Sequence, residues 1–260
     1  MSTYDLIGEN YNLTRKADPM IASIIWNLLD LPVGKMLLDV GCGRGNYTNA
    51  LHNLGGTMFG IDPSTKMLQK AMNNQPSIKW RIGAVENTKF VEEFFDGATA
   101  TLTIHHWDDH QRGFKSIYDG LKPGAPLVIF TSTSEQMKGY WLNAYFPEML
   151  EKSMAQMPTK IHVANALLSL GYELVSETLY SIHPRLEDQF LYSGKHNPNL
   201  YLDAGFRSGI SSFRLHCTED ELASGLSKLT ADIKSGKVFE VINEYKNQGG
   251  DYLFIKAIKV

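Results

Sequence analysis

The sequence predicts an α/β fold in which helices cover both faces of a mostly parallel sheet. In the first half of the chain, short apolar stretches at residues 36–40, 57–61 and 98–104 have the composition of buried strands. Segments with helical spacing of apolar residues separate them, and a Pro-Gly turn leads into a further strand at 127–131. Strands that alternate with amphipathic helices are typical of βαβ units, whose strands run parallel.

Three glycines follow the strand at 36–40. Gly41, Gly43 and Gly45 lead directly into a helix whose apolar face begins at Tyr47. Glycines allow a ligand to approach the backbone closely, and the start of a helix presents unpaired N–H groups to the same place. This arrangement predicts a nucleotide or nucleoside site.

An acidic residue ends the next strand. Asp62 lies about 20 residues beyond Gly41, the offset at which a carboxylate can accept hydrogen bonds from both ribose hydroxyls. A dinucleotide fingerprint would also need glycine or alanine where Asn46 stands. The pairing of glycine loop and acid is therefore specific for a nucleoside, but it fits a dinucleotide poorly.

The stretch from Asp39 to Gly45 reads D-x-G-x-G-x-G. It closely resembles motif I of class I S-adenosylmethionine-dependent methyltransferases, and the chain is similar to their small-molecule subgroup with methyltransferase domains of the 11/25 type. The Leu-Lys-Pro-Gly turn at 121–124 and the IHHWDD stretch at 104–109 are also like that family. The resemblance implies a Rossmann-like seven-stranded sheet with an antiparallel last strand. It also implies S-adenosyl-L-methionine as cofactor and S-adenosyl-L-homocysteine as product.

The same resemblance implies which residues hold the cofactor. The glycine loop meets its amino-acid and ribose part, Asp39 orients that end, the backbone near Ala84 binds the adenine edge, and an N-terminal lid closes over it. The implied contacts are Tyr11, Arg15, Asp39, Gly41, Cys42, Gly43, Asp62, Pro63, Met67, Ala84, Val85, Thr103 and Ile104. The alternatives are a solvated surface for Tyr11 and Arg15 and plain core packing for Met67.

Two histidines follow the strand at 98–104. The carboxyl ends of central strands face the ligand crevice, so His105 and His106 are the candidate catalytic groups, as an imidazole base for an oxygen or nitrogen acceptor. Alternatively, one caps the end of the strand and the other packs. With Asp109 and His110 they resemble a set of metal ligands, but adjacent histidines after a strand point apart, and no metal site is predicted.

We expect residues 1–260 to form one methyltransferase domain in which two insertions make a substrate cap. The clearest helix of the second insertion begins at a capping box formed by Thr218 and Glu221. Aromatic and cationic residues of the insertions suit a small acceptor that bears a carboxylate, with core packing or solvation as the alternative. The candidate acceptor contacts are Trp141, Tyr145, Lys195 and Arg207. The predicted bounds are 17–131 for the cofactor-binding core and 132–170 and 186–250 for the insertions.

Charge and cysteine content restrict the partners and the compartment. The net charge is −3 and no run of lysine or arginine occurs, so nucleic acid is not an expected partner. Cys42 and Cys217 stand far apart, no secretory signal begins the sequence, and no apolar stretch is long enough to cross a bilayer. We therefore expect a cytoplasmic protein without membrane contact, as a monomer or homodimer.

The function predicted from these features is transfer of a methyl group to a small-molecule acceptor by direct in-line displacement, at an oxygen, nitrogen or carbon atom. Two other classes stay open. A catalytically silent protein could bind the cofactor for regulation or assembly, although the intact glycine loop and acid disfavour it. An NAD-dependent oxidoreductase is opposed by Asn46.

Overall fold

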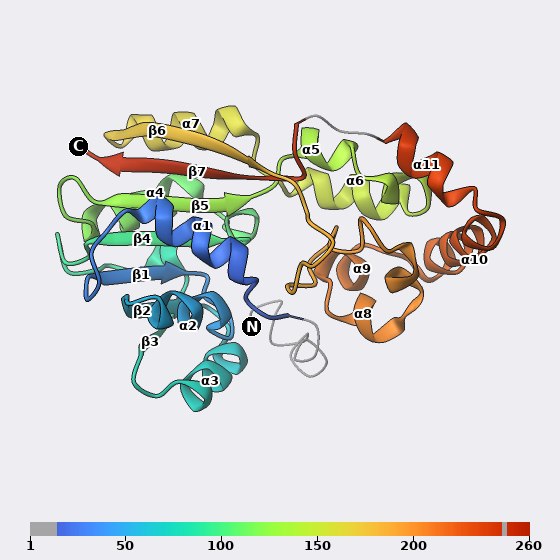
Figure 1. Ribbon diagram of the computed structural model, residues 1–260. Helices are drawn as coiled ribbons and strands as arrows, with labels where there is room; N and C mark the ends of the chain where they lie inside the picture. The colour runs from blue at the N-terminus through green and yellow to red at the C-terminus, as the bar shows by residue number, and fades with distance from the viewer. Residues whose placement is uncertain (1–14, 246–248) are drawn as a thin grey trace.

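The computed structural model describes residues 15–245 and 249–260, and its centre is a seven-stranded sheet. The strands are β1 (Met36–Val40), β2 (Thr57–Asp62), β3 (Lys79–Ile82), β4 (Gly97–Thr101), β5 (Pro126–Thr131), β6 (Tyr172–Tyr180) and β7 (Tyr252–Lys259). Their order is β3-β2-β1-β4-β5-β7-β6, and β7 runs antiparallel to both of its neighbours (Figure 1). The predicted fold class, a mostly parallel sheet with an antiparallel last strand, is confirmed.

Helices cover both faces of this sheet. They are α1 (Pro19–Leu29), α2 (Asn46–Asn53), α3 (Thr65–Asn74), α4 (His110–Gly120) and α7 (Lys160–Ser169). On one face, α1 and α2 bury Ile21 and Leu51 in a core shared with β1 and β5. On the other, α4 and α7 bury Phe114 and Leu167. Helix α3 packs beside β2 and β3.

Local side-chain and backbone signals set where the helices near the site begin. The Asp18 carboxylate accepts the first N–H groups of α1, and the Ser64 hydroxyl accepts the N–H of Met67 at the start of α3. Helix α2 begins after Gly45, whose φ of 78° is left-handed. These starts lie at the carboxyl edge of the parallel strands, so the N–H groups of the first turns point toward that edge.

Further helices form a lobe beyond the carboxyl ends of the parallel strands (Figure 1). We call this lobe the cap and define it as residues 132–158 and 186–245. Helix α7 belongs to the predicted insertion 132–170, but it packs on the sheet against β6 and α4. The cap helices are α5 (Ser134–Lys138), α6 (Pro147–Ala155), α8 (Ala204–Ser208), α9 (Ser211–Leu215), α10 (Glu219–Ser235) and α11 (Val238–Glu244). In the described ranges no helix has the length and apolarity needed to cross a membrane.

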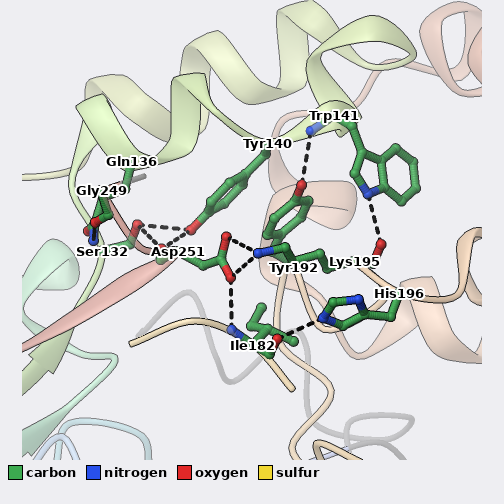
Figure 2. Close-up of polar contacts among 10 residues, drawn as sticks. All are labelled: Ser132, Gln136, Tyr140, Trp141, Ile182, Tyr192, Lys195, His196, Gly249 and Asp251. Atoms are coloured by element: carbon green, nitrogen blue, oxygen red, sulfur yellow. Dashed lines mark hydrogen bonds and ion pairs between the residues drawn. The ribbon is translucent and has the colours of Figure 1, made fainter. Parts of the chain in front are cut away.

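A buried polar cluster joins the cap to the sheet (Figure 2). The ammonium of Lys195 donates to both carboxylate oxygens of Asp251 at 2.9 and 2.7 Å, and Asp251 also accepts the backbone N–H of Ile182. The Tyr140 hydroxyl donates to the backbone carbonyl of Asp251, and its ring stacks on Tyr192 with 3.9 Å between centroids. Because Asp251 directly precedes β7, this cluster fixes the position of the cap relative to the sheet.

Candidate cofactor and acceptor site

A cavity of about 800 Å³ lies at the carboxyl ends of β1, β2 and β4. The segments that follow these strands and β3 form one side of its wall, and Gln156, Leu215 and His216 of the cap form part of the other. Small-molecule sites commonly measure roughly 300–1000 Å³, and α/β sheets bind ligands at this edge. Both its size and its position make this cavity the candidate functional site.

Gly41 and Gly43, in the loop after β1, differ in what a side chain at each position would contact. Both adopt left-handed conformations, with φ of 64° at Gly41 and 54° at Gly43. A Cβ on Gly41 would lie 1.8 Å from the Thr103 hydroxyl oxygen, whereas a Cβ on Gly43 would meet no atom within 4 Å. Because Gly43 lines the cavity, the bare backbone there leaves room for a ligand.

The Asp62 carboxylate ties the end of β2 to this glycine loop. One oxygen accepts the N–H of Gly43 and the other accepts the N–H of Ser64, both at 2.8 Å. Asp62 also lines the cavity, and each oxygen of a carboxylate can accept more than one hydrogen bond. The loop and the acid are thus held in a fixed relation that suits a ribose.

Apolar side chains accompany Asp62 on the same wall. Ile61, Pro63, Met67 and Val85 also line the cavity, and Met67 and Val85 are nearly fully buried. Apolar side chains around a slot suit the faces of a flat ring such as adenine. Together with the bare backbone at Gly43 and the acid, these residues fit an adenosyl cofactor.

Comparison with known proteins points to methyltransferases. The family profile described as a methyltransferase domain matches residues 38–129. Ubiquinone biosynthesis O-methyltransferase of Rattus norvegicus is 31% identical over 125 residues, covering 45% of this chain and 36% of that protein. Demethylmenaquinone methyltransferase of Paenarthrobacter aurescens is 25% identical over 138 residues, covering 53% and 54%. The chain thus spans only about a third to a half of the length of these curated relatives.

A solved structure extends the similarity to nearly the whole chain. A protein assigned as a methyltransferase from an antibiotic biosynthesis pathway of Anabaena variabilis is 31% identical with a TM-score of 0.83, and the match covers 93% of this chain and 98% of that one. The chain belongs to the class I S-adenosylmethionine-dependent methyltransferase family. Geranyl diphosphate C-methyltransferase of Streptomyces coelicolor, at 14% identity and a TM-score of 0.58 over 93% of this chain and 76% of that one, shares the fold.

Most of the predicted cofactor contacts of this methyltransferase lie on the cavity wall. They are Arg15, Gly41, Cys42, Gly43, Asp62, Pro63, Met67, Ala84, Val85 and Thr103. Tyr11 lies outside the described residues. The cavity therefore brings together residues from the start of the chain, the glycine loop and the ends of three strands, while their roles in binding stay predictions.

Two predicted contacts, Asp39 and Ile104, are buried behind the described cavity wall, and their roles stay predictions. The Asp39 carboxylate is buried under the glycine loop, where it accepts hydrogen bonds from the hydroxyls of Thr48 and Thr99. Burial raises the pKa of Asp39 to about 6, against the two hydrogen bonds that lower it. Ile104 is fully buried in the core beneath α4. Both residues pack behind the residues that line the cavity.

Arg15 connects the described start of the chain to the cap at the cavity wall. Its guanidinium donates to both carboxylate oxygens of Asp188, which also accepts the Tyr47 hydroxyl at 3.1 Å. Asn46 donates its side-chain amide to the backbone carbonyl of Arg15 at 3.0 Å. The residue that breaks the dinucleotide fingerprint thus holds the backbone of Arg15 beside the glycine loop.

His105 and His106 both line the cavity, from a 3₁₀ turn at Ile104–His106. The expectation that their side chains point apart is wrong, because the turn brings the ring centroids to 3.9 Å. Desolvation, followed by the neighbouring ring and the charge of Arg15, holds the pKa of His105 well below 6.5. Desolvation, then Arg15 and His216, lowers the pKa of His106 to about 4. Both imidazoles are therefore neutral at pH 7.

The structure offers no metal-binding arrangement around these histidines. Within the described residues, no group of three or more histidine, cysteine, aspartate or glutamate side chains is placed to hold a metal ion. The His110 ring nitrogen instead bonds the backbone carbonyl of Ile104 at 2.9 Å. The Asp109 carboxylate caps α4 by accepting the N–H of Arg112.

The four predicted acceptor contacts are not among the described residues that line this cavity, and their role in acceptor binding stays a prediction. Trp141 is buried inside the cap and donates its indole N–H to the carbonyl of Lys195, whose ammonium pairs with Asp251. The Tyr145 hydroxyl donates to a carboxylate of α10 at 3.0 Å. The Arg207 guanidinium donates to a backbone carbonyl of the cap at 2.6 Å. These polar groups make contacts within the cap or, for the Lys195 ammonium, between the cap and the residue before β7.

Several wall residues were not predicted from the sequence. Asp188, Gln156, Leu215 and His216 come from the cap, and the Gln156 amide nitrogen lies 2.8 Å from Nε2 of His216. Leu102 follows β4 with a left-handed φ of 51° and also lines the cavity. No local motif or periodicity marks these positions, because they meet only through the long-range packing of the cap on the sheet.

Proposed function

We propose that this chain binds S-adenosyl-L-methionine in the cavity and transfers its methyl group to a small-molecule acceptor held under the cap. The observation that carries the proposal is the joint placement of Asp62 and Gly43 on the cavity wall, tied by a 2.8 Å hydrogen bond. Membership of the methyltransferase family supports the same cofactor.

The chain's own residues have a limited task in this reaction. When bound, the cofactor supplies a methyl group on a sulfonium, whose sulfur leaves as a neutral thioether. Asp62 and Gly43 orient the bound nucleoside, and Leu215 and Gln156 of the cap help to exclude water. Holding two reactants in a near-attack geometry can lower the activation barrier by roughly 7–11 kcal/mol. No covalent nucleophile is needed.

A small acceptor is supported by the cap, which covers the carboxyl edge of the sheet and contributes to the cavity wall. The names of the rat and Paenarthrobacter relatives refer to ubiquinone biosynthesis and demethylmenaquinone, both small molecules. We also propose that the protein works in a reducing compartment such as the cytoplasm, because Cys42 and Cys217 are free thiols. We propose a monomer or a homodimer.

The proposal is tested by isothermal titration with S-adenosyl-L-homocysteine on the full chain. We expect saturable binding by the wild type and a loss of about 10–100-fold in affinity for Asp62→Asn, because the amide replaces one acceptor oxygen with a donor. The matched control Asp119→Asn removes an exposed carboxylate of α4 and should bind like the wild type.

Two outcomes would contradict this function. One is a wild-type protein that binds NADH but not S-adenosyl-L-homocysteine, which would favour an oxidoreductase. The other is an Asp62→Asn variant with unchanged affinity. A methylation assay on metabolite extracts with labelled cofactor then separates an enzyme from a silent binding protein.

A further inference from the structure

The indole ring of Trp80 lies against two glycines, one in β2 and one at the end of the glycine loop. Trp80 belongs to β3 and stands directly opposite Gly60 of β2 in the parallel register. A Cβ on Gly60 would lie 2.5 Å from Cε3 of the ring, and a Cβ on Gly45 would overlap Cη2 of the same ring. The six-membered part of the indole therefore touches the backbone of both glycines.

Gly60 is explained by this ring rather than by its backbone conformation. It lies inside β2 without a positive φ, so other residues could adopt its conformation. Glycine inside a strand weakens the strand and often marks the close approach of another group. The groups that approach here are the Trp80 ring and the Cys42 thiol, whose sulfur would lie 3.0 Å from a Cβ. An aromatic side chain on the neighbouring strand can compensate for a glycine in a sheet.

Gly45 connects the same ring to the glycine loop. Near the start of the loop, the N–H of Cys42 donates to the carbonyl of Ile61 at 3.1 Å, and the Gly45 N–H then donates to the Cys42 carbonyl at 2.9 Å. Gly45 is buried, and the three atoms nearest to a Cβ there all belong to Trp80. The ring therefore prevents the end of the loop from moving toward β3.

Trp80 is itself held in place from outside the cavity. Its indole N–H donates to the backbone carbonyl of Gln75, directly after α3, at 3.0 Å, and its ring packs against the core beneath α1 and α2. It is not among the described residues that line the cavity. An effect of Trp80 on a ligand must therefore act through the loop.

We infer that Trp80 is a positioning residue, whose ring holds the glycine loop through Gly45 and Gly60 and thereby raises the affinity for S-adenosyl-L-methionine and S-adenosyl-L-homocysteine. This inference rests on the proposed function. Gly43, which the ligand is expected to approach, lies two residues before Gly45. A loop that already has the binding conformation loses less conformational freedom when the ligand binds.

Titration calorimetry with S-adenosyl-L-homocysteine on the full chain compares Trp80→Ala with the matched control Trp26→Ala. Both rings are partly buried against the same core, and Trp26 lies in α1 away from the described wall. Both variants should unfold at lower urea concentration, but only Trp80→Ala should lose about tenfold or more in affinity. Trp80→Phe keeps a flat ring opposite Gly60 and should stay within about threefold of the wild type.

Hydrogen exchange at the amides of residues 41–49 reports the loop itself. Exchange should be faster in Trp80→Ala than in the wild type, unchanged in Trp26→Ala, and slow again in Trp80→Ala saturated with S-adenosyl-L-homocysteine. A ring that only contributes to overall stability would not change the loop selectively. Unchanged exchange in Trp80→Ala would contradict the inference.

A double-mutant cycle with Gly60→Ala tests the contact between ring and strand. In the wild type the added methyl group overlaps the ring and should lower the affinity about tenfold, whereas in Trp80→Ala the same change should lower it less than about threefold. Additive losses would overturn the inference, as would wild-type affinity in Trp80→Ala or an equal loss in Trp26→Ala. If Trp80→Ala does not fold, Trp80→Leu, which also lacks a flat ring, takes its place in every comparison.

Binding of S-adenosyl-L-homocysteine to the wild type is measured first. If the wild type does not bind it, the proposed function fails, and the inference fails with it. If the wild type binds and Trp80→Ala binds equally well, only the role of Trp80 fails.

Discussion

Single glycines decide how close a ligand can come to the loop after β1. Gly43 combines a left-handed backbone with open space where a Cβ would stand, and it faces the cavity. Gly124, in the turn before β5, has the same two properties, with φ of 76° and no atom within 4 Å, and it is not a cavity-wall residue. The two positions therefore differ mainly in whether a ligand is expected beside them.

Gly43→Ala should lower the affinity for S-adenosyl-L-homocysteine at least about tenfold, since the added methyl group occupies space that the ligand needs. Gly124→Ala should cost a similar free energy of unfolding, roughly 1 kcal/mol, with no change in affinity. Calorimetric titration and urea unfolding on both variants check this. Equal affinities for the two variants would show that the ligand does not approach Gly43.

Asp39 makes the stability depend on pH. Its pKa is raised from 3.8 to about 6 in the folded chain, so its contribution to stability is complete below pH 3.8 and is lost as the pH rises through 6. One pKa unit corresponds to about 1.4 kcal/mol, which makes the loss about 3 kcal/mol. Relative to Asp39→Asn, the wild type should therefore become less stable by about this amount from well below pH 3.8 to well above pH 6, measured by urea unfolding. If the difference in free energy of unfolding between the wild type and Asp39→Asn does not vary with pH, the buried Asp39 does not have a raised pKa.

At the scale of elements, the attachment of the cap depends on the cluster in Figure 2. Lys195 and Asp251 pair at 2.7 Å with side-chain exposures of 25% and 2%, whereas Lys160 and Glu177 pair at the same distance with 52% and 41%. Breaking a buried pair leaves an uncompensated charge, but an exposed pair contributes little.

Lys195→Met should therefore lower the free energy of unfolding by about 3 kcal/mol, and Lys160→Met should change it by less than about 1 kcal/mol. Urea unfolding monitored by tryptophan fluorescence also reports the cap, since Trp141 donates to the Lys195 carbonyl. Similar losses in the two variants would mean that the cluster does not hold the cap in place.

The elements that the sequence predicts best are those with local signals. The strand at 36–40 and the glycine loop after it each depend on neighbouring residues, and both are present. The capping box at Thr218 is only half formed. Thr218 accepts the N–H of Glu221, but the Glu221 carboxylate instead accepts the N–H of Met149 in α6. Competition from a distant element is not visible in a local motif.

In the candidate site, too, the sequence predicts residues with local signals and misses residues that depend on long-range packing. Gly43 and Asp62 are connected by motif spacing, and the sequence predicts both as wall residues. Lys195 and Arg207 are predicted as acceptor contacts because they are cations among aromatics, but Arg207 bonds a backbone carbonyl within the cap and Lys195 joins the cap to Asp251 before β7. Asp188 and His216 reach the cavity only because the cap folds back over the sheet, so no spacing along the sequence predicts them.

For the whole molecule, the arrangement that matters is a cap over the carboxyl edge of a parallel sheet (Figure 1). The sheet supplies the glycine loop and Asp62, and the cap supplies Asp188, Gln156 and His216. In the proposed function the cofactor lies on the sheet side of the cavity, within the residues 38–129 that match the methyltransferase profile, and the acceptor lies on the cap side.

The most direct measurement is a crystal structure of the full chain grown with S-adenosyl-L-homocysteine. We predict the nucleoside in the cavity, with its ribose hydroxyls on the Asp62 carboxylate and its amino-acid part against Gly43. Ligand density elsewhere, or an Asp62 carboxylate turned away from a bound ribose, would contradict the account.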